Sequence, residues 1–252
     1  MSPKPNLQDL LDLFRLHHSA QTFQDQAKDA ASKNLSHLAF LENLLSQEAS
    51  LRHQRIVQLR LAQSKLPVVK TMDTFDWAHP SCIPKQLILN AFSLDFVEQK
   101  ENLILVGPSG VGKSHVAQAL TYAACQKEVK TLWTTAADIV NTLTAAKPDR
   151  SLSRAIKHYA APKLLAIDEL GFLPLDKDGS DLFFQVISHR YEQGSVVLTT
   201  NRAFKDWGKI FNDNTVATAI LNRLVHHGDV AKIEGASYRV KNRREKTTRS
   251  AG

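Results

Sequence analysis

The chain has 252 residues, of which 43% are hydrophobic and 23% are charged. These fractions are those of an ordinary globular protein, and they exclude a disordered or fibrous chain. Its 32 Lys and Arg against 25 Asp and Glu give a net charge of +7, which suits an anionic partner but is also ordinary surface charge. Apolar runs are strand-sized, and Asp9 and Asp12 interrupt the N-terminal apolar segment, so we expect neither a membrane partner nor a secretory signal. Two cysteines cannot build a disulfide framework, which favours the cytoplasm.

Residues 1–66 are predicted to form a small all-α N-terminal domain that binds DNA or a partner. Apolar residues recur at helical spacing from Leu7 to Phe14, from Leu35 to Leu45 and from Leu51 to Leu59. The stretch 19–32, rich in Gln, Ala and Asp, fits either a third helix or a loop. Pro67 ends the last helix, and residues 67–101 are predicted to hold a linker and the first helix of the next domain.

After residue 101, short β-rich runs alternate with helical runs, which predicts an α/β domain with a parallel sheet flanked by helices over residues 102–240. The expected strands are Asn102–Val106, Val129–Thr134, Lys163–Ile167, Ser195–Thr200 and Val230–Glu234. Residues 241–252 form a basic tail, for which we expect partial disorder.

The segment from residue 107 to residue 114, GPSGVGKS, matches the phosphate-binding pattern GxxxxGK[ST] between an apolar strand and a helix. Its glycines can take positive φ and bring backbone N–H groups around phosphate oxygens at the positive end of the helix. Lys113 adds a cation near the β and γ phosphates, and the Ser114 hydroxyl suits Mg²⁺. The expected phosphate-binding residues are Gly107, Pro108, Ser109, Gly110, Val111, Gly112, Lys113, Ser114 and His115.

Two further strand ends carry polar residues that suit a nucleotide site. The apolar run Leu164–Ile167 leads into Asp168 and Glu169, and the run Ser195–Thr200 delivers Asn201. We predict that Asp168 binds nucleotide-bound Mg²⁺, that Glu169 polarises the attacking water and that Asn201 senses the γ phosphate.

These three motifs, in this order, resemble those of an AAA+ ATPase. More narrowly, the chain resembles the IstB family of insertion-sequence transposition helpers, to which the helicase loader DnaC is a cousin. The likeness covers almost the whole chain. It rests on the phosphate turn and on FLENLLSQEASLRHQR (residues 40–55), IDELGFLPLD (167–176), LTTNR (198–202) and NRLVHHGDVAKIEGASYR (222–239).

The resemblance implies an ATPase that assembles as a multimer on target DNA and recruits its cognate transposase, with hydrolysis of ATP to reset the complex. In AAA+ rings an arginine of one protomer completes the nucleotide site of the next. Arg223 is similar in position to this finger, and Arg239 to a second sensor. The chain departs from the family at Asn222, where an aspartate is common, and this weakens the assignment of Arg223.

Candidate DNA contacts lie in two basic segments without a helix-turn-helix or zinc-finger signature, so we expect phosphate contacts that are nearly blind to base sequence. They are Arg52, Arg55 and Arg60 in the first segment, and Lys147, Arg150, Arg154 and Lys157 in the second. Each cluster also fits a solvated helix face.

Three alternatives stay open at the level of sequence. The same domain could serve a helicase loader, a small-molecule kinase with a phosphate turn, or a nucleotide-regulated binding module that scarcely hydrolyses ATP. The histidine pairs His17-His18 and His226-His227 lack the additional ligands that a zinc site needs, so we predict no metal there.

Overall fold

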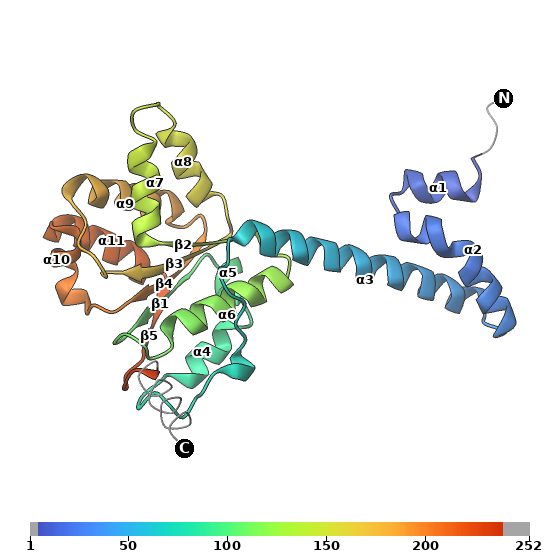
Figure 1. The fold of residues 1–252 in the computed structure, drawn as a ribbon, viewed down its shortest axis with the longest axis horizontal. Helices are drawn as coiled ribbons and strands as arrows, with labels where there is room; N and C mark the ends of the chain where they lie inside the picture. The colour runs from blue at the N-terminus through green and yellow to red at the C-terminus, as the bar shows by residue number, and fades with distance from the viewer. Residues whose placement is uncertain (1–4, 239–252) are drawn as a thin grey trace, which may run out of the picture. The chain divides into compact units, whose positions relative to one another are not determined.

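The computed structural model describes residues 5–238, and the chain divides into two compact units, residues 1–59 and 60–252 (Figure 1). We call them unit 1 and unit 2. The long helix α3 (His37–Ser64) begins in unit 1 and ends in unit 2. The basic tail 241–252 lies outside the described residues.

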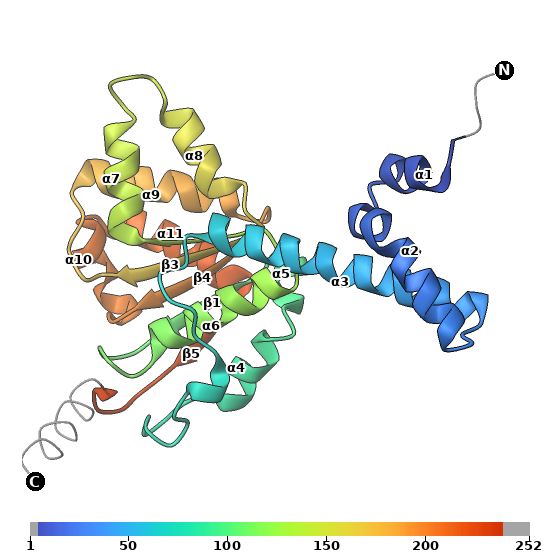
Figure 2. The same cartoon turned by 45° about the vertical axis from the view of Figure 1, so that its right-hand side comes forward.

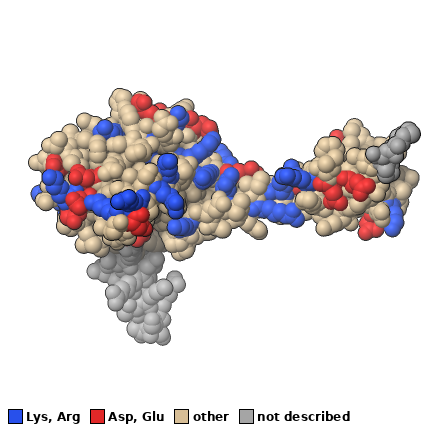
Figure 3. All heavy atoms as spheres, turned by 90° about the horizontal axis from the view of Figure 1, so that it is seen from above, with Lys and Arg blue, Asp and Glu red and all other residues tan. Residues whose placement is uncertain are grey.

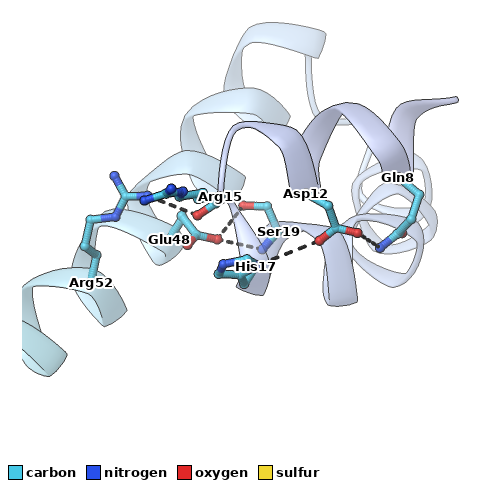
Figure 4. A network of polar contacts seen from close by, with 7 residues as sticks. All are labelled: Gln8, Asp12, Arg15, His17, Ser19, Glu48 and Arg52. Atoms are coloured by element: carbon cyan, nitrogen blue, oxygen red, sulfur yellow. Dashed lines mark hydrogen bonds and ion pairs between the residues drawn. The ribbon is translucent and has the colours of Figure 1, made fainter. Parts of the chain in front are cut away.

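Unit 1 contains α1 (Leu7–Leu13), α2 (His17–Ser32) and most of α3. Residues 19–32, which the sequence predicted to be either a helix or a loop, are helical. Figure 4 shows how α3 contacts the first turn of α2: the Glu48 carboxylate accepts bonds from the Ser19 backbone N–H (2.8 Å) and hydroxyl (3.1 Å). Arg52 donates to the Arg15 carbonyl at 3.1 Å. Polar contacts therefore supplement the small apolar core of this unit.

Unit 2 is built around a five-stranded sheet in which every pair of strands is parallel, in the order β2-β3-β4-β1-β5. The strands are β1 (Asn102–Val106), β2 (Thr131–Thr135), β3 (Leu164–Leu170), β4 (Ser195–Thr200) and β5 (Gly228–Lys232). The predicted α/β class is confirmed, and β1 and β4 have the predicted bounds. The other three strands differ from their predicted bounds by one to three residues at both ends.

Helices cover both faces of the sheet (Figure 2). They are α4 (Lys85–Ala91), α5 (Asp95–Glu98), α6 (Lys113–Gln126), α7 (Ala136–Ala145), α8 (Leu152–Ala160), α9 (Lys177–Arg190), α10 (Trp207–Phe211) and α11 (Asn214–His226), with 3₁₀ turns at Met72–Thr74 and Phe204–Asp206. Two apolar clusters result, because alternate side chains of a strand point to opposite faces. In β1, Ile104 joins the cluster of α7, α9 and α11, whereas Leu103 and Leu105 join that of α4 and α6.

Arg190, the last residue of α9, is a buried cation that forms hydrogen bonds with the ends of neighbouring helices and strands. Its side chain is 1% exposed and donates to five backbone carbonyls, those of residues 159, 160, 162, 163 and 195. Burial lowers the pKa of Arg190 to about 9, so the guanidinium is still charged at neutral pH. These bonds join α8, α9 and the starts of β3 and β4.

Among residues 5–238, no helix combines the length and the apolar character that crossing a membrane requires. The 28-residue helix α3 carries Arg52, Arg55 and Arg60 along its length. Cys82 is an exposed thiol and Cys125 a buried one, and both are free.

Candidate nucleotide-binding site

A cavity of about 460 Å³ opens where the carboxyl ends of β1, β3 and β4 meet. This is the edge at which parallel α/β sheets bind ligands, and the volume is in the range of small-molecule sites. Of the predicted residues, its wall contains Asp168, Glu169, Asn201 and the phosphate turn from Ser109 to His115. Residues that the sequence did not single out complete the wall: Lys70, Thr74, Phe75, Asp76, His79, Pro80, Gln118, Phe172, Thr199 and Tyr238.

The glycines of the phosphate turn are required for two different reasons. Gly110 and Gly112 have φ of +84° and +104°, the left-handed region that favours glycine, as predicted. Gly107 was expected to share this conformation, and that prediction is wrong. A Cβ on Gly107 would lie 2.0 Å from the Ile233 carbonyl oxygen, so the residue must be small because the backbone after β5 passes against it.

Lys113 and Ser114 open helix α6, and both line the cavity. Lys113 is 8% exposed, and its Nζ donates to the carbonyls of Gly107 and Pro108 at 2.7 Å each. The ammonium is therefore held inside the turn that would surround a phosphate. The Ser114 hydroxyl donates to Asp168 Oδ1 at 2.9 Å, which joins the phosphate turn to the end of β3.

A β-bulge in β3 places both acidic residues on the same cavity. On a regular strand, neighbouring side chains point to opposite faces. Here Ile167 pairs with Leu198 and Leu170 with Thr200, so Asp168 and Glu169 together lie opposite one residue of β4. Glu169 takes φ of +64° at this bulge. Asp168 is buried and Glu169 is exposed, yet both line the cavity.

Thr199, the residue of β4 opposite the bulge, connects the two acidic residues. Its hydroxyl donates to Asp168 Oδ1 and accepts the backbone N–H of Glu169 at 3.1 Å. The side chain is 1% exposed. Sequence reasoning missed this residue, since a threonine inside an apolar strand resembles any other strand residue.

The oxygen donors around Asp168 fit Mg²⁺. This ion binds hard oxygen ligands at 2.0–2.1 Å in an octahedron, where neighbouring ligand oxygens lie about 2.9 Å apart. The Ser114 hydroxyl and the Asp168 carboxylate oxygen are separated by 2.9 Å. They are therefore spaced as adjacent ligands of one ion.

Two segments distant in the sequence cover the phosphate turn. Before the sheet, the Thr71 carbonyl contacts His115 Nε2 at 2.8 Å, and a Cβ on Gly112 would lie 2.6 Å from the Phe75 ring. After β5, the Tyr238 N–H donates to the Gly110 carbonyl at 2.9 Å. The two segments also pair with each other through a backbone bridge between residues 82 and 234. Sequence reasoning assigned the first of these segments to a linker and did not predict its contact with the phosphate turn.

The three residues predicted to read or complete the γ-phosphate site lie in different places. Asn201 is exposed and lines the cavity. Arg223, on α11, does not line it: the guanidinium lies 4.7 Å from the centroid of the Phe184 ring and donates to the Ala219 carbonyl at 3.0 Å. Arg239 lies outside the described residues.

The candidate DNA-binding residues are all on described helices or loops, but some have structural partners. In the first segment, Arg52 is bonded to a carbonyl of unit 1 and Arg60 Nε to the Glu128 carbonyl at 2.9 Å, whereas Arg55 is exposed. In the second segment, the exposed residues Lys147, Arg150, Arg154 and Lys157 follow one another through the α7–α8 connection and α8, and Lys147 forms an ion pair with Asp178 at 2.8 Å. Figure 3 looks down on the end of unit 2 that carries this connection and shows basic side chains with acidic ones beside them.

Comparison with known proteins finds sequence similarity that covers both units of the chain. The family described as IstB-like ATP binding protein matches residues 9–246. A protein of insertion sequence IS21 from Pseudomonas aeruginosa, named for ATP binding, is 38% identical over 95% of this chain and 90% of its own length. Its counterpart in insertion sequence IS232 of Bacillus thuringiensis subsp. berliner is 40% identical over 92% of each chain.

Solved structures similar to this chain share the fold of unit 2. The DnaC helicase loader superposes with a TM-score of 0.53 over 65% of this chain and 96% of its own, at 20% identity. AMPPCP-bound DnaA from Aquifex aeolicus gives 0.54 over 65% of this chain and 49% of its own, at 17% identity. At these identities the likeness shows the AAA+ fold alone. From the match over most of its length, the chain belongs to the IstB-like family of insertion-sequence ATP-binding proteins.

Proposed function

We propose that this protein is an ATPase that assists the transposase of an insertion sequence on DNA. The observation that carries the proposal is the convergence of Lys113, Ser114, Asp168, Glu169 and Asn201 on one cavity at the carboxyl edge of the sheet. A small-molecule kinase is less favoured, because a glutamate and an asparagine at the ends of adjacent strands fit water as the phosphoryl acceptor.

The phosphate turn binds the triphosphate. Backbone N–H groups of residues 110–114 and the positive end of α6 stabilise the phosphate oxygens. Lys113 is already directed into the turn, and transfer of its hydrogen bonds from the two carbonyls to phosphate oxygens requires only side-chain movement. Ser114 and Asp168 hold Mg²⁺, which neutralises charge on the transferred phosphoryl group.

Hydrolysis requires a group that orients and deprotonates water. Glu169 fits this role because its exposed side chain lines the cavity beside the buried Asp168. Asn201 orients the same water and contacts the γ phosphate. Arg223, which lies outside the cavity of its own chain, completes the site of a neighbouring protomer, and Arg239 contributes from the residues after Tyr238.

In this proposal the protomers assemble on DNA. Lys147, Arg150, Arg154 and Lys157 form an exposed basic segment that suits phosphate oxygens of either strand, with no element that reads base edges. The insertion-sequence relatives support a transposase as the partner. In this proposal ATP favours the multimer on double-stranded DNA, and hydrolysis releases it in the cytoplasm.

The substitution Glu169→Gln tests the assigned chemistry. The variant should bind ATP like the parent and hydrolyse it at least ~100-fold more slowly, since general base catalysis contributes about 10²–10⁴ in rate. Glu98→Gln, at an exposed glutamate on α5, is the matched control and should turn over ATP normally. Unchanged hydrolysis by Glu169→Gln would overturn the role of this residue.

DNA binding is tested separately by salt titration. Each neutralised phosphate releases counterions, so affinity for duplex DNA should fall steeply as salt rises. Replacing both Arg154 and Lys157 with alanine should reduce the slope of log K against log[salt] by about 1.8, if both contact phosphates. A flat salt response of the parent would contradict phosphate-based binding.

A further inference from the structure

The histidine pair at the end of α11 acquires a third candidate metal ligand in the folded chain. His226 is the last residue of α11, and Glu192 follows the end of α9, 34 residues earlier. One ring nitrogen of each histidine and one carboxylate oxygen of Glu192 all lie within 4.8 Å of one another. We propose that Glu192, His226 and His227 form a site for a zinc-class transition-metal ion.

The end of the helix brings the neighbouring histidines together. Within an α-helix, consecutive side chains diverge by about 100°. His227 leaves the helical conformation, with φ of −124° and ψ of 69°. The two imidazole rings consequently lie with centroids 4.1 Å apart at an angle of 61°. The sequence alone could not show this convergence, because it depends on where the helix ends.

The chemistry of the three donors and the spacing of one pair of them fit zinc. In a tetrahedral site with bonds of 2.0–2.1 Å, neighbouring ligand atoms lie about 3.3 Å apart. His227 Nε2 and Glu192 Oε1 are separated by 3.3 Å. Two imidazoles and one carboxylate form a ligand set found in zinc enzymes, with the fourth position left to water. The Tyr191 hydroxyl bonds His226 Nδ1 at 2.8 Å and holds that ring in place.

The proposed metal site is separate from the nucleotide cavity. Glu192 precedes β4 and His227 precedes β5, so both lie at the amino edge of the parallel sheet, whereas the phosphate turn lies at its carboxyl edge. Between them, the N–H of Asn102 at the start of β1 donates to the His227 carbonyl at 2.7 Å. A bound ion would therefore join the turns before β4 and β5. The ligands are partly solvent-exposed and Arg223 lies one turn earlier on α11, so we expect weaker binding than at a buried four-ligand site.

Zinc titration of the full chain without a histidine tag tests the proposal. Calorimetry should show one Zn²⁺ ion per chain. The double substitution His226→Ala and His227→Ala should weaken binding by at least ~10-fold, and Glu192→Gln should weaken it in the same direction. His189→Ala is the matched control, because this exposed histidine of α9 bonds the Gln185 carbonyl of its own helix. ATP binding by each variant, expected to be unchanged, verifies the fold.

Two results would overturn the assignment. One is a parent chain that binds no Zn²⁺ at millimolar concentration. The other is a double variant that keeps ATP binding and binds Zn²⁺ as tightly as the parent, which would mean that other histidines hold the ion.

Discussion

Replacement of Thr199 by valine removes the one hydroxyl that connects Asp168 to the backbone of Glu169. Valine has nearly the same shape as threonine, so the change opens no cavity in the sheet. We expect the two acidic residues to be less well positioned while nucleotide affinity is kept, because the Thr199 hydroxyl bonds both residues of the β-bulge.

The size of the effect follows from the lost bonds. A hydrogen bond to a charged group contributes about 1.5–3 kcal/mol, and the unpaired N–H of Glu169 costs roughly 1 kcal/mol more. If only the bond to Asp168 bears on the transition state, a loss of about 1.5–3 kcal/mol corresponds to a roughly 10- to 150-fold lower kcat. Asp168 that has lost the Thr199 hydrogen bond is less well positioned to bind metal. Half-maximal activity of the valine variant should therefore require more Mg²⁺ than that of the parent.

Steady-state hydrolysis over a range of ATP and Mg²⁺ concentrations measures both effects, and Thr199→Ser is the matched control that keeps the hydroxyl. The serine variant should retain most of the kcat and the parental Mg²⁺ requirement. Our reasoning would fail if the valine variant hydrolysed ATP like the parent, or if the serine variant were as impaired as the valine one.

Three further substitutions test other parts of the structure. Gly112→Ala should abolish binding of a fluorescent ATP analogue, because the added methyl group would strike the Phe75 ring at a residue with φ of +104°; normal binding would contradict the described turn. Arg190→Met should lower the free energy of unfolding in urea by at least ~3 kcal/mol, since five carbonyls lose their donor. Burial raises the pKa of Glu48, but hydrogen bonds from Ser19 outweigh it and leave that pKa lowered. Glu48 therefore stabilises unit 1 above pH 4.5 and loses this effect as the pH falls further, so Glu48→Gln should flatten the acid dependence of helix content seen by circular dichroism.

Much of unit 2 could be predicted from local patterns. Strands β1 (NLILV) and β4 (SVVLTT) have apolar centres and are buried along almost their whole length, and their C-terminal bounds were predictable because a glycine or an asparagine follows immediately. The meeting of the phosphate turn with Asp168, Glu169 and Asn201 was also predictable, since parallel strands bring their carboxyl ends to one edge.

The remaining features depend on contacts between distant residues. The backbone of Ile233, 126 residues later, leaves no room for a Cβ at Gly107, and no local pattern carries that information. Thr199 acquires its role from a bulge in the neighbouring strand, and the helix at residues 19–32 is stabilised by Glu48 of another helix. Apolar residues at helical spacing are few in that stretch, which is why the sequence did not distinguish a helix from a loop.

The position of β1 between β4 and β5 has a consequence for synthesis on the ribosome. The phosphate turn emerges early, yet the strand that borders it on one side ends at Thr200 and the strand on the other side at Lys232. A nascent chain that has released only the first half of unit 2 therefore has a glycine-rich turn on an unpaired strand. Both strand pairs that border the phosphate turn can therefore be present together only after residue 232 has been synthesised.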